Sequence, residues 1–247
     1  MAKFRPGVGP TVLTFVAAAA FFALGFWQLS RNEWRKRDLA LKAARTELAE
    51  TPVEEAIADP ASHAFRRVVA RGRWEIADTI IVGPAERGRD LGARVLTPLA
   101  LANGSPARVL VDRGFIPERE IKNFLPPDAG AVTPASAEPV TVHGLALELA
   151  LRDAKPGSRD SRHTHHPRFN PDRPGIVKKI NAQLPYELAP IMVQSSDTGP
   201  GGLPIGDVAR PVSPVDHLGY ALTWFAVGTL SLVAWIEFGR RRAREAS

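Results

Sequence analysis

Two long apolar runs without charged side chains frame this chain. The first extends from Pro6 to Ser30, and the second extends from His217 to Ile236. About 20 apolar residues, at ~1.5 Å each, are needed for a helix to cross a ~30 Å hydrocarbon core. The pattern predicts membrane-spanning helices over 11–30 and 217–238, with a tail of residues 1–10 before the first and a basic tail, 239–247, after the second.

The first run has an alternative interpretation as a cleaved signal peptide. Lys3 and Arg5 would form its basic region, and Ala17 to Ala20 resembles a cleavage site. However, the apolar run continues as far as Trp27, beyond the roughly 7–15 apolar residues of a signal peptide. An uncleaved membrane anchor is therefore favoured.

Residues 31–50 are predicted to continue the first helix out of the membrane, since Trp34, Leu41 and Leu48 recur every seven residues among charges. Residues 51–197 differ: short runs rich in Val and Ile alternate with Gly, Pro, Asn and Asp. Six strands are expected, over 66–75, 79–82, 93–101, 108–112, 140–147 and 190–194.

Other local signals complete the predicted domain. Asn103-Gly104 between two strands predicts a hairpin, a helix is expected over 176–184, and the Gly- and Pro-rich stretch 198–216 is predicted to be a linker. The expected fold class is a membrane protein whose two terminal transmembrane helices flank a β-rich α+β extracytoplasmic domain.

The net charge of +6 does not indicate nucleic acid, because its location matters more than its size. The two ends of the chain account for +4, and the long middle has only +2. Basic residues beside apolar runs are typical of membrane flanks. A loop of nearly 190 residues translocates largely regardless of its own charge. We therefore expect both tails inside and the domain outside, with membrane lipid and no nucleic acid among the partners.

Several classes of chemistry are excluded or unsupported. The chain contains no cysteine, which excludes disulfides, zinc-thiolate sites, iron–sulfur clusters and thiol nucleophiles. The phosphate-binding, zinc-protease and serine-hydrolase motifs are also absent from the sequence. We expect a protein that is not an enzyme; a tethered periplasmic hydrolase stays an alternative that no motif favours.

One candidate site lies at the start of the second apolar run. His217, Tyr220 and Trp224 are spaced i, i+3 and i+7, which places them on one face of a helix. A neutral imidazole is a common ligand of haem iron, and an ionisable residue at the edge of a membrane span is a functional candidate. The competing interpretation is an interfacial belt of amphipathic rings.

The end of the first run has a matching group. Trp27, Gln28, Arg31 and Trp34 would lie at the membrane depth of His217 if the two spans are antiparallel. The Trp rings could then flank a porphyrin, and Arg31 could pair with a propionate. The competing interpretation is again an aromatic belt with a snorkelling arginine.

Two weaker candidates lie between the spans. His163, His165 and His166 could bind a divalent metal, but neighbouring arginines oppose a cation, and a solvated loop is favoured. Arg113 places a charge within an apolar strand, where it needs a partner if it is buried.

The order of several short segments resembles the surfeit locus protein 1 family. The segments are LGFWQLSRNEWRKRDL, FRRVVARGRW, GARVLTPLAL, RVLVDRGFIP, ELAPIMVQ and HLGYALTWF. The resemblance extends from about Thr11 to Glu237, with one span near each end and one domain between. The family's aromatic-rich stretch after Asn170-Pro171-Asp172 is replaced here by Ile176, Val177 and Lys178.

The resemblance implies an assembly factor, or chaperone, for haem–copper cytochrome c oxidase. Its implied partners are oxidase subunit I and other assembly factors, and its implied cofactor is haem a. His217 would be the axial ligand of the haem iron, with Tyr220, Trp224, Trp27 and Arg31 in the binding site. The alternative is a cofactor-free membrane clamp that stabilises assembly intermediates. The first span begins by about Thr11, so a mitochondrial transit peptide does not fit before it. We therefore expect a bacterial inner membrane and a periplasmic domain.

Overall fold

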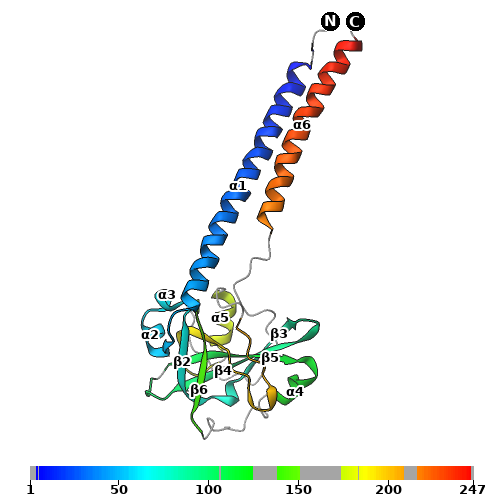
Figure 1. Ribbon diagram of the computed structural model, residues 1–247. Coiled ribbons are helices and arrows are strands. Elements are labelled where there is room, and N and C mark those ends of the chain that lie inside the picture. Colours follow the sequence, from blue (N-terminus) through cyan, green and yellow to red (C-terminus); the bar gives the residue numbers. More distant parts are fainter. Residues whose placement is uncertain are drawn as a thin grey trace. The chain divides into compact units, whose positions relative to one another are not determined.

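The computed structural model describes residue 4 and residues 6–105, 107–124, 138–150, 174–182, 184–208 and 216–245. The chain divides into two compact units (Figure 1). One unit comprises Met1–Leu41 and Pro211–Ser247, and the other comprises Lys42–Arg210. The sequence-predicted loop 152–173, with His163, His165 and His166, lies outside the described residues.

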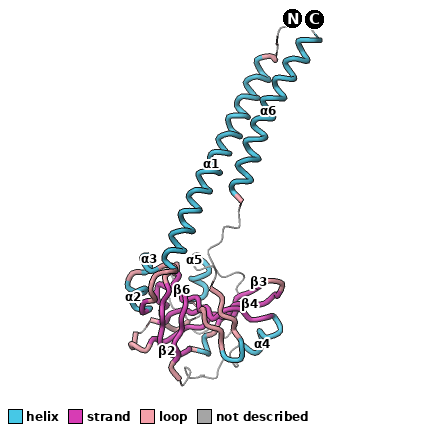
Figure 2. The backbone as a smooth tube through the Cα atoms, in the orientation of Figure 1, coloured by secondary structure: helices cyan, strands magenta, loops and turns pink. Residues whose placement is uncertain are grey.

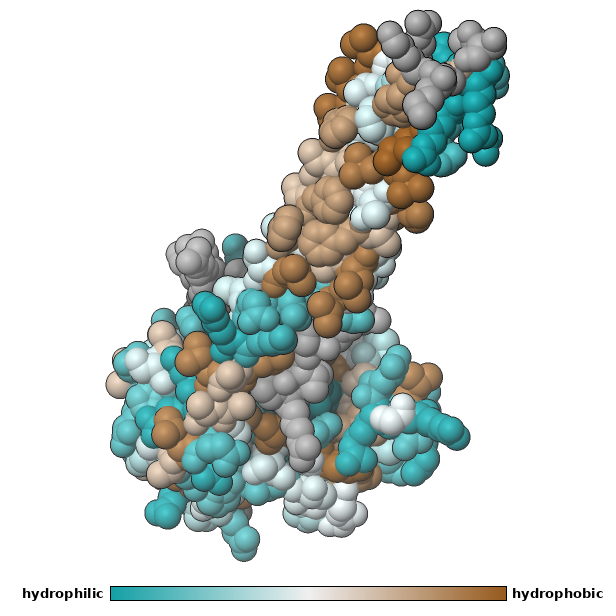
Figure 3. Space-filling model, turned by 45° about the horizontal axis from the view of Figure 1, so that its top comes forward, coloured by the Kyte–Doolittle hydropathy of each residue, from teal (hydrophilic) through white to brown (hydrophobic). Residues whose placement is uncertain are grey.

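The first unit is a pair of helices, α1 (Val8–Thr46, counted with this unit as far as Leu41) and α6 (His217–Glu245), which lie side by side in Figure 2. The pair is antiparallel: Gln28 contacts His217 near one end, and Thr11 contacts Trp235 near the other. Both helices are long and apolar enough to cross a membrane. Hydrophobic side chains dominate the surface of the pair in Figure 3. The expected apolar terminal helices are therefore present.

Aromatic rings pack against small residues between the two helices. The ring of Phe225 on α6 occupies the place that a side chain at Gly25 on α1 would need. In the reverse direction, Phe21 and Phe22 on α1 pack over Gly228 on α6. Small residues let helix backbones approach closely, which strengthens dispersion contacts where no hydrophobic effect drives association.

The second unit is a closed β-barrel. Strands β2 (Arg67–Trp74), β6 (Val140–Glu148), β7 (Leu188–Ser195), β5 (Arg108–Pro117) and β4 (Asp90–Leu101) are hydrogen-bonded in this order, and a second pairing between β2 and β4 closes the ring. Two further strands extend the sheet beyond the ring: β1 (Thr51–Pro52) joins β2, and β3 (Ile80–Arg87) joins β4. The prediction of a β-rich domain is confirmed, and the Asn103-Gly104 hairpin does connect antiparallel strands β4 and β5.

Short helices decorate the barrel. They are α2 (Val53–Ala58), α3 (Pro60–His63), α4 (Ile121–Phe124) and α5 (Pro174–Asn181), together with 3₁₀ turns at Ile76–Asp78, Glu118–Glu120 and Pro200–Gly202. The predicted helix over 176–184 corresponds to α5, which begins two residues earlier, because Pro174 suits the first turn of a helix, and ends three residues earlier, at Asn181.

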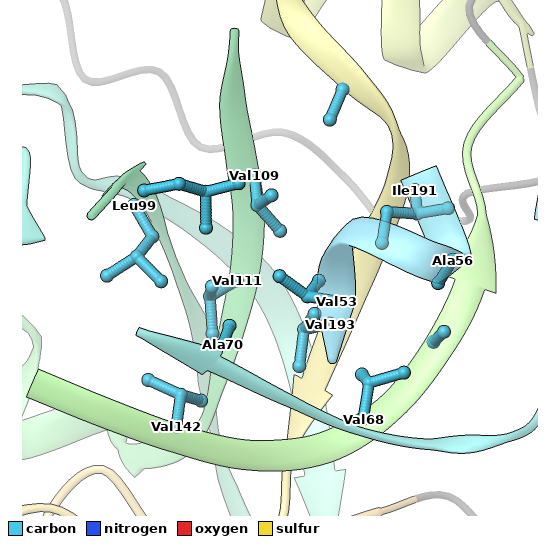
Figure 4. Close-up of a cluster of buried hydrophobic side chains, with 13 residues drawn as sticks. Val53, Ala56, Val68, Ala70, Leu99, Val109, Val111, Val142, Ile191 and Val193 are labelled. Atoms are coloured by element: carbon cyan, nitrogen blue, oxygen red, sulfur yellow. The ribbon is translucent and has the colours of Figure 1, made fainter. Parts of the chain in front are cut away.

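The barrel interior is filled by small and branched side chains (Figure 4). Period-2 alternation directs every second residue of a strand inward. The inward residues include Val68 and Ala70 of β2 and Val109 and Val111 of β5. Helix α2 contributes the fully buried Val53 and Ala56 to the same cluster.

A second buried cluster covers the outer face of β4, β5 and β7. Val177 and Ile180 of α5 pack there against Leu96, Leu110 and Met192. The strands β5 and β7 are therefore buried on both faces, which explains why their sequences are nearly continuous apolar runs rather than alternating ones.

Several boundaries differ from those expected. Strand β3 continues to Arg87 rather than ending at Val82, β5 continues to Pro117 rather than ending at Asp112, and α6 continues to Glu245 rather than ending at residue 238. The first helix ends at Thr46 rather than near Pro52, because Thr51 and Pro52 pair with β2 in extended conformation. Residues 198–208 belong to the barrel unit, although the sequence predicts a linker from 198. Phe115 and Ile205 exchange two backbone hydrogen bonds, of 2.9 and 2.8 Å, which hold this stretch against β5.

The closing pair of strands makes Gly72 sensitive to substitution. A Cβ at Gly72 would overlap the backbone carbonyl of Ala100 across the β2–β4 seam. We expect Gly72→Ala to lower the free energy of unfolding by about 3 kcal/mol, because the barrel backbone must move apart. Thermal unfolding followed by circular dichroism measures this. Gly88→Asn is the control: Gly88 has a φ of +64° and open space around it, and Asn tolerates that conformation. Equal stability losses in both variants would contradict the prediction.

Candidate functional site

His217 is the first residue of α6, and its imidazole meets α1. Its Nδ1 lies 2.9 Å from Oε1 of Gln28, and the contact is partly buried. Because an amide oxygen only accepts, Nδ1 carries the hydrogen and donates it. In the neutral imidazole, Nε2 is then left with a free lone pair, which is the form that a metal ligand requires.

The other two residues of the predicted His217 face differ in their surroundings. Trp224 stacks on Phe21 of α1, with ring centroids 5.8 Å apart and planes inclined by 14°. Tyr220 is 56% exposed on the outer surface of α6. The spacing therefore places Trp224 in the contact between the helices and Tyr220 outside it.

The α1 residues divide in the same way. Gln28 faces α6, while Trp27 is 58% exposed. The guanidinium of Arg31 lies 4.4 Å from the ring centroid of Trp34, one helical turn later. The helix pair thus brings Gln28 to His217, and it leaves Trp27, Arg31 and Tyr220 on the outer surface around that contact.

A second polar group lies in the barrel unit, around the bend in β5. Asp112 is buried, and its Oδ2 accepts a hydrogen bond of 2.6 Å from Nε of Arg94. Its Oδ1 accepts from the backbone N–H of Gly114 at 3.1 Å. Burial raises the pKa of Asp112, and the charge of Arg94 opposes this change. This pair is a satisfied structural contact.

Arg113, the weaker candidate from the sequence, lies between Asp112 and Gly114 in the chain. Its side chain does not join their contacts but meets Trp74 instead. Its guanidinium is 4.9 Å from the ring centroid of Trp74. Burial lowers the pKa of Arg113. Both side chains line a cavity of about 390 Å³. The sequence marked Arg113 by its charge in an apolar run, but Trp74 had no signal that distinguished it from an ordinary core aromatic.

A further polar network joins the start of β5 to the segment before β7. Arg108 pairs with Glu75 at 2.9 Å and lies over the ring of Tyr186, at 5.1 Å from its centroid. The hydroxyl of Tyr186 donates to Asp78 at 2.7 Å. Burial and this carboxylate raise the pKa of Tyr186 well above its usual range. All four groups are partnered, so the network stabilises the fold.

The described residues contain no group of three His, Asp or Glu side chains placed to hold a metal ion. A second cavity, of about 490 Å³, has His143, Glu50 and Arg67 in its lining. There, Nδ1 of His143 pairs with Glu50 at 3.0 Å. The motifs for nucleotide and hydrolase chemistry are absent from the sequence.

Comparison with known proteins identifies the family. The family model described as "SURF1 family" matches residues 15–229, which is most of the chain. The chain belongs to the SURF1 family.

Named relatives agree with the family model over most of their length. This SURF1-family protein is 26% identical to "Surfeit locus protein 1" of Takifugu rubripes, over 88% of this chain and 91% of that one. It is 24% identical to a "SURF1-like protein" of Monosiga brevicollis, over 89% and 84% of the two chains. It is 23% identical to "Surfeit locus protein 1" of Homo sapiens, over 92% and 76%.

The segments that carried the resemblance occupy the framework of both units. FRRVVARGRW, GARVLTPLAL, RVLVDRGFIP and ELAPIMVQ contain β2, most of β4, β5 and most of β7, which are four of the five strands of the closed ring. The first and last segments contain Gln28 and His217, respectively. The family signature of this protein therefore coincides with the barrel wall and with the contact between the two helices.

The absence of cysteine allows a clean test of the helix contact. The double variant Gln28→Cys with His217→Cys should be joined by a short bismaleimide in membranes, because the two side chains meet in the folded helix pair. Mass spectrometry of linked peptides measures the product. Trp27→Cys with His217→Cys is the matched control, since Trp27 is exposed away from α6. Equal linking of the two pairs would contradict this register of the helices.

Proposed function

We propose that this protein is an assembly factor for haem–copper cytochrome c oxidase, and that it holds haem a and aids its insertion into subunit I. The proposal joins the family membership to one contact, the hydrogen bond between His217 and Gln28. An imidazole oriented by Gln28 at the edge of an apolar helix pair suits the binding of an apolar, iron-containing macrocycle.

The residues around His217 fit such a group. Gln28 fixes the imidazole so that Nε2 carries the lone pair. Tyr220 and Trp27 present exposed rings on the outer surface of the helix pair, where a porphyrin could lie against them. Arg31 carries a guanidinium that could pair with a propionate. Haem a, when bound, would supply the redox-active iron of the oxidase, and this protein would bind, orient and release it.

The held imidazole also suits delivery rather than permanent binding. The described part of the helix pair offers no second histidine, and the chain has no cysteine. A macrocycle held by one protein ligand dissociates more readily than one held by two, because a second coordinate bond need not be broken. Subunit I would then receive the group from this protein.

The two apolar helices are proposed to cross a bacterial inner membrane, with the barrel in the periplasm. The length and hydropathy of α1 and α6 support the crossing. The arginines at the end of α6 and the small net charge of the middle of the chain support an orientation with both tails in the cytoplasm.

The first test is an optical spectrum of the purified full-length protein, co-expressed with the enzymes that make haem a. We expect a Soret band in the wild type and its loss in His217→Ala. Gln28→Ala should weaken haem binding about 10- to 100-fold, as is usual when the partner of a ligating histidine is removed. His143→Ala is the control, because this histidine pairs with Glu50 in the barrel unit.

A pure, folded, colourless wild-type protein would refute the haem site. The same holds if His217→Ala carries as much haem as the wild type. In either case, the cofactor-free clamp on oxidase assembly intermediates becomes the better account.

The orientation is tested separately by single cysteines in this cysteine-free chain. Asn103→Cys lies in the exposed hairpin turn between β4 and β5, and Ser247→Cys lies at the end of the C-terminal tail. A membrane-impermeant maleimide added to intact spheroplasts should label Asn103→Cys and should reach Ser247→Cys only after lysis. The reverse labelling pattern would overturn the proposed orientation.

A further inference from the structure

The two ends of the barrel interior differ. Helix α2 brings Val53 and Ala56 into the core beside Val68 and Ile191, which lie near the first residues of β2 and β7. At the other end, the inward-facing rows of four strands end at Trp74 of β2, Arg113 of β5, Val140 of β6 and Ser195 of β7. The cavity of about 390 Å³ lies among these four residues. Mouths of small barrels are frequent ligand sites.

A β-bulge directs Arg113 into this mouth. Val95 of β4 pairs with Gly114, and the next residue, Leu96, pairs with Asp112, so Arg113 is left without a partner on β4. Gly114 has a φ of +117°, which suits only glycine, and its N–H is bound by Asp112. Bulges commonly re-aim a side chain at the rim of a barrel. The ion pair of Asp112 with Arg94 holds this local geometry.

Arg113 has no ion-pair partner within the described part of the chain, although Glu138 and Asp197 line the same cavity. Asp112, the nearest acid in sequence, is already paired with Arg94. Among the described residues, Arg113 forms no ion pair, and its guanidinium lies over the face of the Trp74 ring. A half-buried guanidinium gains strongly from a carboxylate, which can accept two parallel hydrogen bonds.

The surroundings favour a ligand with one negative charge and an apolar body. Trp74, Val140 and Pro200 supply apolar surface in the cavity. Glu138 and Asp197 lie at its rim, and Asp197 accepts a hydrogen bond of 2.8 Å from the N–H of His143. These two carboxylates repel every anion, and a polyphosphate far more strongly than a singly charged group, so an anion that pairs with Arg113 here should carry a single charge.

We propose that the mouth of the barrel binds an organic carboxylate attached to an apolar group, with Arg113 pairing with the carboxylate and Trp74 contacting the apolar part. Such a group occurs at the carboxyl end of a polypeptide and in small branched-chain acids. None of the residues involved belongs to the helix pair, so a negative result for haem binding would not bear on this site, and the reverse is also true.

The experiment uses the full-length protein in a non-ionic detergent and ligand-observed NMR titration. The probes are N-acetyl-leucine and its amide, which differ only in the charge to be recognised. We expect the amide to bind about 10-fold or more weakly, the loss typical of a charge-assisted hydrogen bond. Arg113→Met should weaken binding of N-acetyl-leucine to a similar degree. Arg73→Met is the matched control, because Arg73 is exposed on β2 and does not line the cavity.

A stability measurement separates loss of binding from loss of fold. Arg113→Met removes a half-buried charge without creating a large cavity, so its Tm should equal or exceed that of the wild type. If its Tm falls steeply, Arg113→Lys is used instead, because it keeps the charge but loses the bidentate geometry and should still weaken binding.

The source of the carboxylate is distinguished by a third probe, 4-methylpentanoate. Tighter binding of N-acetyl-leucine identifies a polypeptide terminus as the ligand, and equal binding identifies a small branched-chain acid. The proposal is overturned if neither acid binds, if the amide binds as tightly as the acid, or if Arg113→Met binds like the wild type.

Discussion

The pairing of β2 with β4 is the constraint on which the barrel depends. Only three residue pairs form this seam, from Gly72 opposite Leu101 to Trp74 opposite Leu99. They convert a sheet with two open edges into a ring, so the inward rows of Val and Ala enclose a common core. The seam is tight because Gly72 has no side chain and lets the backbone of Ala100 approach. Without this seam, no pairing would hold β2, which carries Trp74, close to β5, which carries Arg113, at this end of the barrel.

The bulge in β5 adds one residue, and this residue changes which environments the neighbouring side chains enter. Before the bulge, β5 is a wall strand that is buried on both faces, inward through Val111 and outward through Leu110. At the bulge, Asp112 turns outward to Arg94, and Arg113 turns inward to Trp74. The stretch around Ile205 then pairs with Phe115, where β7 no longer accompanies β5. An ion-paired carboxylate and a cation that forms no ion pair among the described residues are thus adjacent in sequence, and their side chains lie on opposite sides of the strand.

The helix pair follows a different physical rule. Its contact is made of aromatic rings set against glycines and against one another, as with Phe225 over Gly25 and Trp224 on Phe21. Such contacts rely on dispersion and close approach, which remain effective where there is no water to drive association. At the His217 end, a polar contact joins that residue to Gln28. A polar group in an apolar setting is costly unless it forms a hydrogen bond, and this contact pairs one polar atom of each side chain. The same hydrogen bond favours the tautomer of His217 that carries its hydrogen on Nδ1.

The sequence alone determined the two apolar helices, the β-rich middle, the β4–β5 hairpin and the family, because these depend on local periodicity, turn residues and short ordered motifs. It also identified His217 and Gln28 as residues at matching depth. The tertiary structure alone decided the closure of the barrel, the attachment of residues 198–208 to β5, and the placement of Arg113 over Trp74. Each of these depends on pairing between residues far apart in the chain, and a single strand's pattern of apolar positions does not reveal which strand lies beside it. The same limit explains why one helix face could be predicted for His217, Tyr220 and Trp224, whereas only the packing against α1 separated the partly buried His217 and Trp224 from the exposed ring of Tyr220.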